Sequence, residues 1–303
     1  METNEFSKSQ GNLKCNHCPE CLGFGCISEL PGLGGVFQNQ NFQLNCQAWK
    51  NLQTLAKQNN TLSQIQSIPV SPSILRCGPV TGAQENIGYQ NEEDFYFPYL
   101  NNAAKNKIGI CVGDGYPDQK LHYGINAMKK ITAKNPSIKA AFFLKPYPQE
   151  KLFERIDWVL PYASHIGIDI DSYNIVTMRN LVNLEQKTAE QLLQIKNKIN
   201  VPFVIKGVFT QKDIQLVKEV QPDVVYISNH GGRVETEIGS SADFLVEHAP
   251  LLKNYCKEIW VDGGIRNKLD IQTALFYGAS QVIMARPFIH ATFNNTDYSS
   301  IYN

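Results

Sequence analysis

The chain has 303 residues, enough for one large α/β domain or two smaller ones, so a sizeable core is available without disulfide bonds. Its 28 lysines and arginines balance 28 acidic residues, which removes the electrostatic reason to expect a nucleic acid or an anionic membrane as partner. We therefore expect small-molecule ligands. The opening METNEFSKSQ lacks an apolar signal segment, and no apolar run is long enough to span a membrane, so the sequence predicts a soluble, cytoplasmic protein.

Four of the eight cysteines crowd into one polar stretch near the start of the chain, namely Cys15, Cys18, Cys21 and Cys26. Thiolates two residues apart can converge on one ion, and this spacing predicts a site for zinc or an iron–sulfur cluster without separating the two. Free or redox-active thiols in a flexible arm are the alternative. Residues 1–66 show no repeat that matches the rest, and we expect them to form an N-terminal arm.

From about residue 67 to the end, short apolar runs alternate with longer segments of helical period. The expected strands are 73–80, 108–112, 139–144, 165–170, 202–206, 223–228, 258–261 and 281–285. The expected helices are 92–105, 124–134, 149–160, 187–198, 211–220, 241–255 and 269–277. Such alternation is typical of βα units and a parallel sheet.

The count favours a (β/α)8 barrel over residues 67–303, with an open doubly wound sheet as the competing fold. Glycines and polar residues recur after most of the strands, as in a barrel, whereas an open sheet would concentrate them at one switch point. No eighth helix is expected, because the Asn- and Ser-rich end of the chain follows directly after Phe288. The apolar surface left beside the first and last strands would then need a cover, which predicts a homo-oligomer or packing by the N-terminal arm.

Four successive strand ends carry the chemistry: VIKG, ISNHGGR, VDGGIR and MARPF. Loops after the last two strands of a barrel commonly bind phosphate, and these bring Gly263, Gly264, Arg266 and Arg286 together. Glycines let the backbone approach phosphate oxygens, and arginine offers a planar fork of donors. Ordinary turns with solvated arginines are the other interpretation of either motif taken alone.

His230 and Arg233 flank two glycines at the end of the sixth strand. A histidine in this polar strand end could serve as a base beside a fixed cation, although a lone histidine is more often structural. Lys206, at the end of the neighbouring strand, is either a surface lysine with a buried stem or a charge set against a developing anion.

The order VIKG, SNHGGR, DGGIR and RPF resembles the FMN-dependent 2-hydroxy-acid oxidases and dehydrogenases, the family of glycolate and lactate oxidases. The resemblance covers residues 67–290 and is strongest over 202–288. It implies an FMN enzyme that oxidises a small (S)-2-hydroxy acid to the 2-oxo acid, with dioxygen or another electron acceptor completing the cycle.

The resemblance also implies a role for individual residues. His230 would be the base, Arg233 would pair with the substrate carboxylate, Lys206 would stabilise the reduced flavin ring, and Tyr147 would hydrogen-bond the substrate. A second arginine that binds the carboxylate falls at Arg179. The remaining implied cofactor contacts are Gly78, Pro79, Val80, Lys145, Asp169, Ser228, Asp262, Gly263, Gly264, Arg266, Ala285 and Arg286.

Several positions depart from the family pattern, three of them among the implied cofactor contacts. Lys145 replaces a glutamine and Asp169 a threonine, so two neutral flavin contacts become charged, and Ala285 replaces the glycine before the phosphate arginine. Two other functions stay open. One is an FMN-dependent isomerase of the type 2 isopentenyl diphosphate isomerase kind, and the other is a flavin-binding protein without catalytic activity.

Overall fold

The computed structural model describes residues 40–302 apart from 88, 176–177, 179–180 and 235–236. The four clustered cysteines and Arg179 lie outside the described residues. Eight strands follow one another along the chain. They are β1 (Leu75–Cys77), β2 (Ile110–Gly113), β3 (Ala140–Leu144), β4 (Ala163–Asp169), β5 (Phe203–Val208), β6 (Val224–Ile227), β7 (Glu258–Val261) and β8 (Gln281–Met284).

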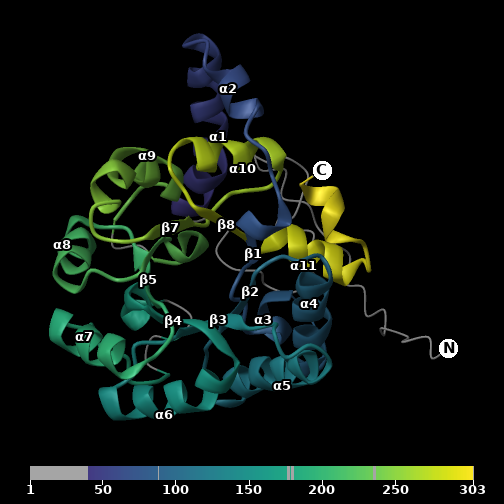
Figure 1. Cartoon of the computed structure of the whole chain (residues 1–303), viewed down its shortest axis with the longest axis vertical. Helices are drawn as coiled ribbons and strands as arrows, with labels where there is room; N and C mark the ends of the chain where they lie inside the picture. Colours follow the sequence, from purple (N-terminus) through teal and green to yellow (C-terminus); the bar gives the residue numbers. More distant parts are fainter. Residues whose placement is uncertain (1–39, 88, 176–177, 179–180, 235–236, 303) are drawn as a thin grey trace.

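The eight strands form one parallel sheet in the order β1-β8-β7-β6-β5-β4-β3-β2. A further parallel bridge joins Arg76 of β1 to Gly109, just before β2, and so closes the sheet on itself. Figure 1 shows the strands in the centre with helices around them. The predicted (β/α)8 barrel is confirmed, and the open doubly wound sheet is excluded.

The helices surround the barrel in chain order (Figure 1). Between β1 and β6 lie α3 (Ala83–Ile87), α4 (Glu93–Lys105), α5 (Gln119–Lys134), α6 (Gln149–Val159), α7 (Ala189–Lys198) and α8 (Gln211–Val220). After β6 come α9 (Ser241–Leu252), α10 (Lys268–Phe276) and α11 (Arg286–Phe293). α7 and α8 each begin with a capping box, in which a threonine side chain and the residue three positions later satisfy each other's backbone N–H groups.

The prediction that no helix follows the last strand is wrong, because the short helix α11 lies directly after β8. α11 is followed by a 3-10 turn over Tyr298–Ile301, whose Tyr298 ring stacks on Phe288 at 4.5 Å between centroids. Tyr298 and Phe288 are fully buried, and α11 packs against α4. The apolar surface beside β1 and β8 is therefore covered by this chain itself. The helix was not predicted because it begins at Arg286, inside the MARPF motif that was assigned to the strand end.

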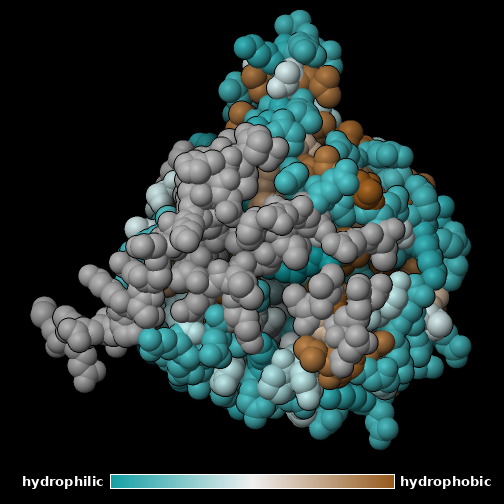
Figure 2. Space-filling model, turned by 180° about the vertical axis from the view of Figure 1, so that it is seen from behind, coloured by the Kyte–Doolittle hydropathy of each residue, from teal (hydrophilic) through white to brown (hydrophobic). Residues whose placement is uncertain are grey.

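Within the described residues, two helices precede the barrel, α1 (Gln40–Gln58) and α2 (Leu62–Gln66). α1 lies against α9, α10 and the loop after β6, and its Trp49 is fully buried. The far end of α1 and α2 project beyond the barrel (Figure 1), and Figure 2 shows a mixture of hydrophobic and hydrophilic side chains on this projection. The described part of the predicted arm thus packs onto the barrel.

Aromatic side chains fill the inside of the barrel. Phe143, Tyr226 and Trp260 contact one another edge to face or tilted, and the Arg76 guanidinium lies 4.0 Å from the centre of the Trp260 ring. These rings leave no open channel along the barrel axis in the part of the chain that the structure describes. A ligand therefore meets the barrel at the carboxyl ends of its strands.

Candidate active site

A cavity of about 620 Å³ lies at the carboxyl ends of the strands. Its volume falls in the range usual for cofactor and substrate sites. Most of the site residues expected from the sequence line it. They are Gly78, Pro79, Val80, Lys145, Asp169, Lys206, His230, Arg233, Asp262, Gly263, Gly264, Arg266, Ala285 and Arg286.

The ends of β3, β4 and β5 bring two lysines onto one buried carboxylate. Lys145 Nζ lies 2.8 Å from Asp169 Oδ2, and Lys206 Nζ lies 2.6 Å from Asp169 Oδ1. All three side chains are almost fully buried. Burial alone would raise the pKa of Asp169, but the two ammonium groups outweigh it and hold this pKa well below its usual value. Asp169 is therefore a permanent anion between two cations.

The loop after β6 carries His230 in an unusual backbone conformation. His230 has φ 57°, and Gly231 and Gly232 follow with φ 62° and 89°, all in the left-handed region. The Asn229 side chain fixes this turn by accepting a hydrogen bond from the Gly232 N–H at 3.0 Å. A residue with a Cβ in this region is strained and needs support from its surroundings. The NHGG sequence thus supplies a rigid turn that directs the imidazole.

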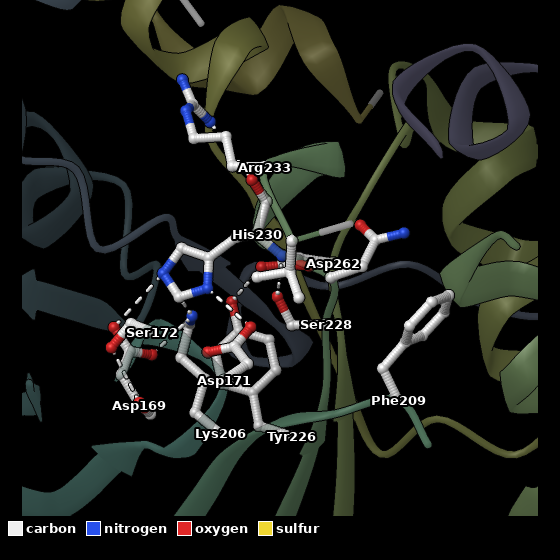
Figure 3. Close-up of polar contacts among 12 residues, drawn as sticks. Asp169, Asp171, Ser172, Lys206, Phe209, Tyr226, Ser228, His230, Arg233 and Asp262 are labelled. Carbon is white, nitrogen blue, oxygen red and sulfur yellow. Dashed lines mark hydrogen bonds and ion pairs between the residues drawn. The ribbon is translucent and has the colours of Figure 1, made fainter. Parts of the chain in front are cut away.

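His230 is held from both sides of its ring (Figure 3). Nδ1 lies 2.7 Å from Asp171 Oδ2, so Nδ1 carries the hydrogen that this carboxylate accepts. Nε2 lies 3.2 Å from Lys145 Nζ, 3.4 Å from Lys206 Nζ and 3.3 Å from Asp169 Oδ2. In neutral His230, Nε2 is then the unprotonated nitrogen and faces two ammonium donors.

Asp171 reaches His230 because of a glycine on the neighbouring strand. Gly207, on β5, has φ 93°, and a Cβ added there would overlap the Asp171 carboxyl group. Asp171 is nearly buried, and its Oδ1 has no hydrogen-bond partner among the described residues. Only glycine at position 207 leaves room for this contact between a carboxylate and the His230 imidazole.

Arg233 lines the same cavity from the other side of His230. Its Nη1 donates a hydrogen bond to the His230 carbonyl at 3.2 Å, and its guanidinium points away from the Asp169 side of the imidazole (Figure 3). An anion that contacted both residues would bridge a guanidinium and an imidazole.

Asp262, at the end of β7, presents an unused acceptor. Its Oδ2 accepts a hydrogen bond from the Tyr226 hydroxyl at 2.7 Å, while Oδ1 is buried and has no hydrogen-bond partner among the described residues. Burial raises the pKa of Asp262, against the opposing effects of Lys206 and Tyr226. A buried, unsatisfied oxygen that lines a cavity is a place for a ligand hydroxyl or N–H group.

The ends of β7 and β8 form a cradle of backbone and arginines. Gly263 and Gly264 have φ 95° and 76°, and Ala285 precedes the first residue of α11. The Arg286 guanidinium lies 4.5 Å from the centre of the Phe42 ring. Two arginines (Arg266 and Arg286) and the amino end of α11 face one part of the cavity, an arrangement that suits a phosphate.

Helix α1 holds these loops in place, a role that was not predicted from the sequence. The Asn45 side chain donates to Asn229 Oδ1 at 2.7 Å and accepts from the Ser241 N–H at 2.9 Å. Trp49 Nε1 donates to the Gly263 carbonyl at 2.7 Å. α1 therefore connects the histidine loop to the glycines after β7.

Two of the expected site residues do not line the cavity. The Tyr147 hydroxyl donates to the Gly115 carbonyl at 3.2 Å, and its ring is covered by the Arg155 guanidinium at 4.1 Å. Ser228 lies beneath the histidine turn, where its hydroxyl accepts a hydrogen bond from the His230 N–H at 3.2 Å. The structure thus places Tyr147 behind the site and Ser228 in its support.

Two further residues of the site, Asp171 and Asp114, were not predicted from the sequence. The signal for Asp171 was the DID string at the end of the fourth strand, in which a second acid follows Asp169 by two residues. Asp114 accepts hydrogen bonds from the Lys145 N–H at 3.1 Å and from the buried Arg155 at 2.7 Å. Burial raises the pKa of Asp114 to about 6 despite Arg155. Asp114 fixes the strand end that carries Lys145.

Three ligand atoms of Asp169, Asp171 and His230 lie close enough together to hold a metal ion. The ammonium groups of Lys145 and Lys206, both in contact with Asp169, would repel a cation there. The group is therefore better suited to proton transfer than to metal binding.

A family model described as FMN-dependent dehydrogenase matches residues 132–296, more than half of the chain. The chain belongs to this family. Among curated proteins, the chain is similar to the L-lactate dehydrogenase (cytochrome) of Saccharomyces cerevisiae, 35% identical over 108 residues, and to 2-hydroxyacid oxidase 2 of Bos taurus, 34% identical over 100 residues. These alignments cover 34% and 33% of this chain but only 18% and 28% of the two relatives.

Solved structures support the fold over a longer part of the chain. A mandelate oxidase with benzoylformic acid aligns with a TM-score of 0.56 and 19% identity, over 76% of this chain and 69% of the other. A mutant flavocytochrome b2 with pyruvate bound aligns with a TM-score of 0.54 and 21% identity, over 72% of this chain and 58% of the other. At these identities the likeness concerns the barrel alone.

The residues present fit the FMN that the family name implies. The unsatisfied Asp262 Oδ1 could accept a hydrogen bond from a ribityl hydroxyl, and the cradle with Arg266 and Arg286 could hold the phosphate. Lys206 would then lie at the ring end of the same cavity. Among the described residues, no helix is both long and apolar enough to cross a membrane.

Proposed function

We propose that this protein is an FMN-dependent oxidoreductase that converts an (S)-2-hydroxy acid to the 2-oxo acid. One observation carries the proposal: His230 is fixed by Asp171 through Nδ1, so that Nε2 faces a cavity that Arg233 and Lys206 also line. A base, a cation for a carboxylate and a cation for a reduced cofactor are the groups that this oxidation needs.

Four side chains of the site each have a defined task in the proposed reaction. Arg233 binds the substrate carboxylate, and His230 Nε2 accepts the proton of the 2-hydroxyl group. Asp171 then stabilises the resulting imidazolium through Nδ1. FMN, when bound, supplies the acceptor for the hydrogen on C2 and its electron pair. Lys206 provides positive charge for the electron-rich cofactor.

The cofactor contacts are part of the same proposal. Gly78, Pro79 and Val80 would lie along the flavin ring, Asp262 along the ribityl chain, and Gly263, Gly264, Arg266, Ala285 and Arg286 around the phosphate. All of these residues line one cavity.

The test is anaerobic mixing of the FMN-loaded protein with a panel of 2-hydroxy acids that includes lactate, glycolate and mandelate. We expect at least one of them to bleach the flavin absorbance and to yield one 2-oxo acid per flavin. His230→Ala should retain FMN while the reduction rate falls about 100-fold or more. Bound FMN that no member of the panel reduces would contradict the proposal and favour a flavin-binding protein without this activity.

An isomerase acting on a diphosphate is disfavoured by the cavity. Three lysines of the described residues line the cavity, and each is already in an ion pair: Lys145 and Lys206 with Asp169, and Lys120 with Glu92 at 3.3 Å. A diphosphate would need further cations that are not engaged in this way. Turnover of isopentenyl diphosphate without net flavin reduction would reverse this conclusion.

Four further expectations belong to the proposal. The electron acceptor, dioxygen or another carrier, can be identified by comparing reoxidation of the reduced protein in air and with artificial acceptors. Metal analysis of protein purified without oxygen tests zinc or an iron–sulfur cluster at Cys15, Cys18, Cys21 and Cys26. Light scattering tests the expected homo-oligomer, and fractionation of the source cells tests the expected cytoplasmic location.

A further inference from the structure

The Lys145 side chain ends beside the atom that the proposed function uses as a base. Its Nζ lies 2.8 Å from Asp169 Oδ2 and 3.2 Å from His230 Nε2, and the residue is 6% exposed. An ammonium group has three N–H donors, and these two contacts account for two of them. Because Lys145 lines the cavity, the third donor is available to a ligand.

Its surroundings hold Lys145 in place. Asp169 is held as an anion between Lys145 and Lys206, and its negative charge offsets part of the repulsion between the two ammonium groups. The Lys145 N–H donates to Asp114 Oδ2 at 3.1 Å, and Asp114 is anchored in turn by the buried Arg155. The strand end is therefore rigid, and the remaining freedom of Lys145 lies in its side chain.

A substrate hydroxyl that binds His230 Nε2 takes the place of the contacts that Lys145 and Lys206 make with this atom, because an unprotonated imidazole nitrogen has one lone pair. A hydroxyl group that donates to Nε2 must place its oxygen about 3 Å from that atom. Lys145 Nζ is already at hydrogen-bond distance from the same atom. Tyr147, the neutral donor expected there, is turned toward the Gly115 carbonyl instead.

We propose that Lys145 is a catalytic residue that donates a hydrogen bond to the oxygen on C2 of the substrate. The inference rests on the proposed function and adds a charged donor to it. As the hydroxyl proton passes to His230 Nε2, negative charge develops on that oxygen, and the Lys145 ammonium stabilises it. The C2–H bond gives its hydrogen and electron pair to FMN, and the C2–O bond becomes the carbonyl bond of the 2-oxo acid.

The experiment compares pairs of ligands that differ at C2, with the oxidised, FMN-loaded protein and no turnover. Pyruvate is paired with propionate, and benzoylformate with phenylacetate, and binding is followed by the change in flavin absorbance. In Lys145→Met we expect the 2-oxo acid to bind about 10- to 100-fold more weakly, because a charge-assisted hydrogen bond is lost. The alkanoate, which lacks the C2 oxygen, should bind within about twofold of the wild-type value.

Lys139→Met is the matched control. Lys139 lies at the opposite end of the same strand region, is exposed and donates to the Pro161 carbonyl at 2.7 Å. The Lys139→Met substitution should leave the affinity for both ligands of each pair unchanged. Addition of propylammonium to Lys145→Ala should restore part of the 2-oxo acid affinity, because the small cation can occupy the space left by the side chain.

Equal weakening of both ligands, or of neither, would overturn the proposal. A shift of the flavin reduction potential without a change in ligand discrimination would also overturn it, since Lys145 would then contact only the cofactor. The result stays separate from the proposed function, which fails if no 2-hydroxy acid reduces the wild-type flavin. The binding comparison involves no turnover and can be read in either case.

Discussion

The His230 Nδ1 atom lies 2.7 Å from Asp171 Oδ2, and this contact decides which nitrogen of the imidazole can act as a base. A carboxylate at Nδ1 fixes the hydrogen there and stabilises the imidazolium that forms when Nε2 takes up a proton. The arrangement predicts that catalysis depends on Asp171 as much as on His230.

Asp171→Asn should preserve the shape of the site but remove this electrostatic support. We expect the rate of flavin reduction by substrate to fall about 100-fold or more, while FMN binding changes little. Rapid-mixing absorbance measurements without oxygen give the rate, and equilibrium titration gives FMN affinity. A variant that reduces flavin at the wild-type rate would show that Asp171 has no part in proton transfer.

A second prediction concerns Gly207, which makes room for Asp171. A Cβ at position 207 would overlap the Asp171 carboxyl group, and the residue also has φ 93°. Gly207→Ala should therefore displace Asp171 from His230, and we expect the reduction rate to fall about 10-fold or more in addition to a loss of stability of about 1–2 kcal/mol. Thermal or denaturant unfolding and rapid mixing measure the two effects.

Gly278→Ala separates backbone strain from the effect on the site. Gly278 has φ 107°, but its added Cβ would meet only the end of the Lys253 side chain, at 2.9 Å from Nζ. This variant should lose a similar amount of stability and keep its activity. Equal activities of the two variants would exclude the role given to Gly207.

The sequence predicted the barrel and most of the site because both depend on local signals. Strand bounds agreed closely where a run was apolar and ended in glycine or a charged residue, as for β7. The first strand is shorter than expected because Pro72–Ile74 form a 3-10 turn before it. Glycine-rich strand ends identified the residues around the cavity, since parallel strands end on one side of a barrel.

What the sequence did not reveal depends on contacts between distant segments. Nothing in the local pattern shows that Asn45 would connect Asn229 and Ser241, which lie far along the chain. Likewise, the Tyr147 side chain does not line the cavity, because its ring packs against the buried Arg155 guanidinium and its hydroxyl donates a hydrogen bond to the Gly115 carbonyl. The direction of a side chain beyond a strand end is set by such tertiary partners.

The third prediction is a pH dependence of stability that comes from Asp169. Its folded-state pKa lies well below the usual 3.8, so its contribution is fully present above about pH 4 and is lost as pH falls through the folded-state pKa. Asp169→Asn cannot titrate and leaves two ammonium groups together. The wild type should exceed it in free energy of unfolding by about 3 kcal/mol at pH 6, and by less at pH 3. Denaturant titrations at the two pH values measure this difference.

Asp114 provides a control, because its effect on the free energy of unfolding should change with pH in the opposite direction. Its folded-state pKa is raised to about 6, so the wild type should lose stability relative to Asp114→Asn as pH rises from about 4 to 6. Parallel trends for the Asp169 and Asp114 variants would contradict the charges assigned to the site.

The fourth prediction tests whether the cradle after β7 and β8 binds phosphate. Arg286 lines the cavity at the start of α11 and packs over the Phe42 ring. Arg286→Met keeps much of the apolar side-chain stem but removes the guanidinium. FMN should then bind about 10- to 100-fold more weakly, because a charge-assisted contact to the phosphate is lost. Riboflavin, which lacks the phosphate, should bind the variant and the wild type alike. Fluorescence titration of the apoprotein with each flavin gives the two affinities. A parallel loss for both would mean that Arg286 supports the fold of the cradle and does not contact the phosphate.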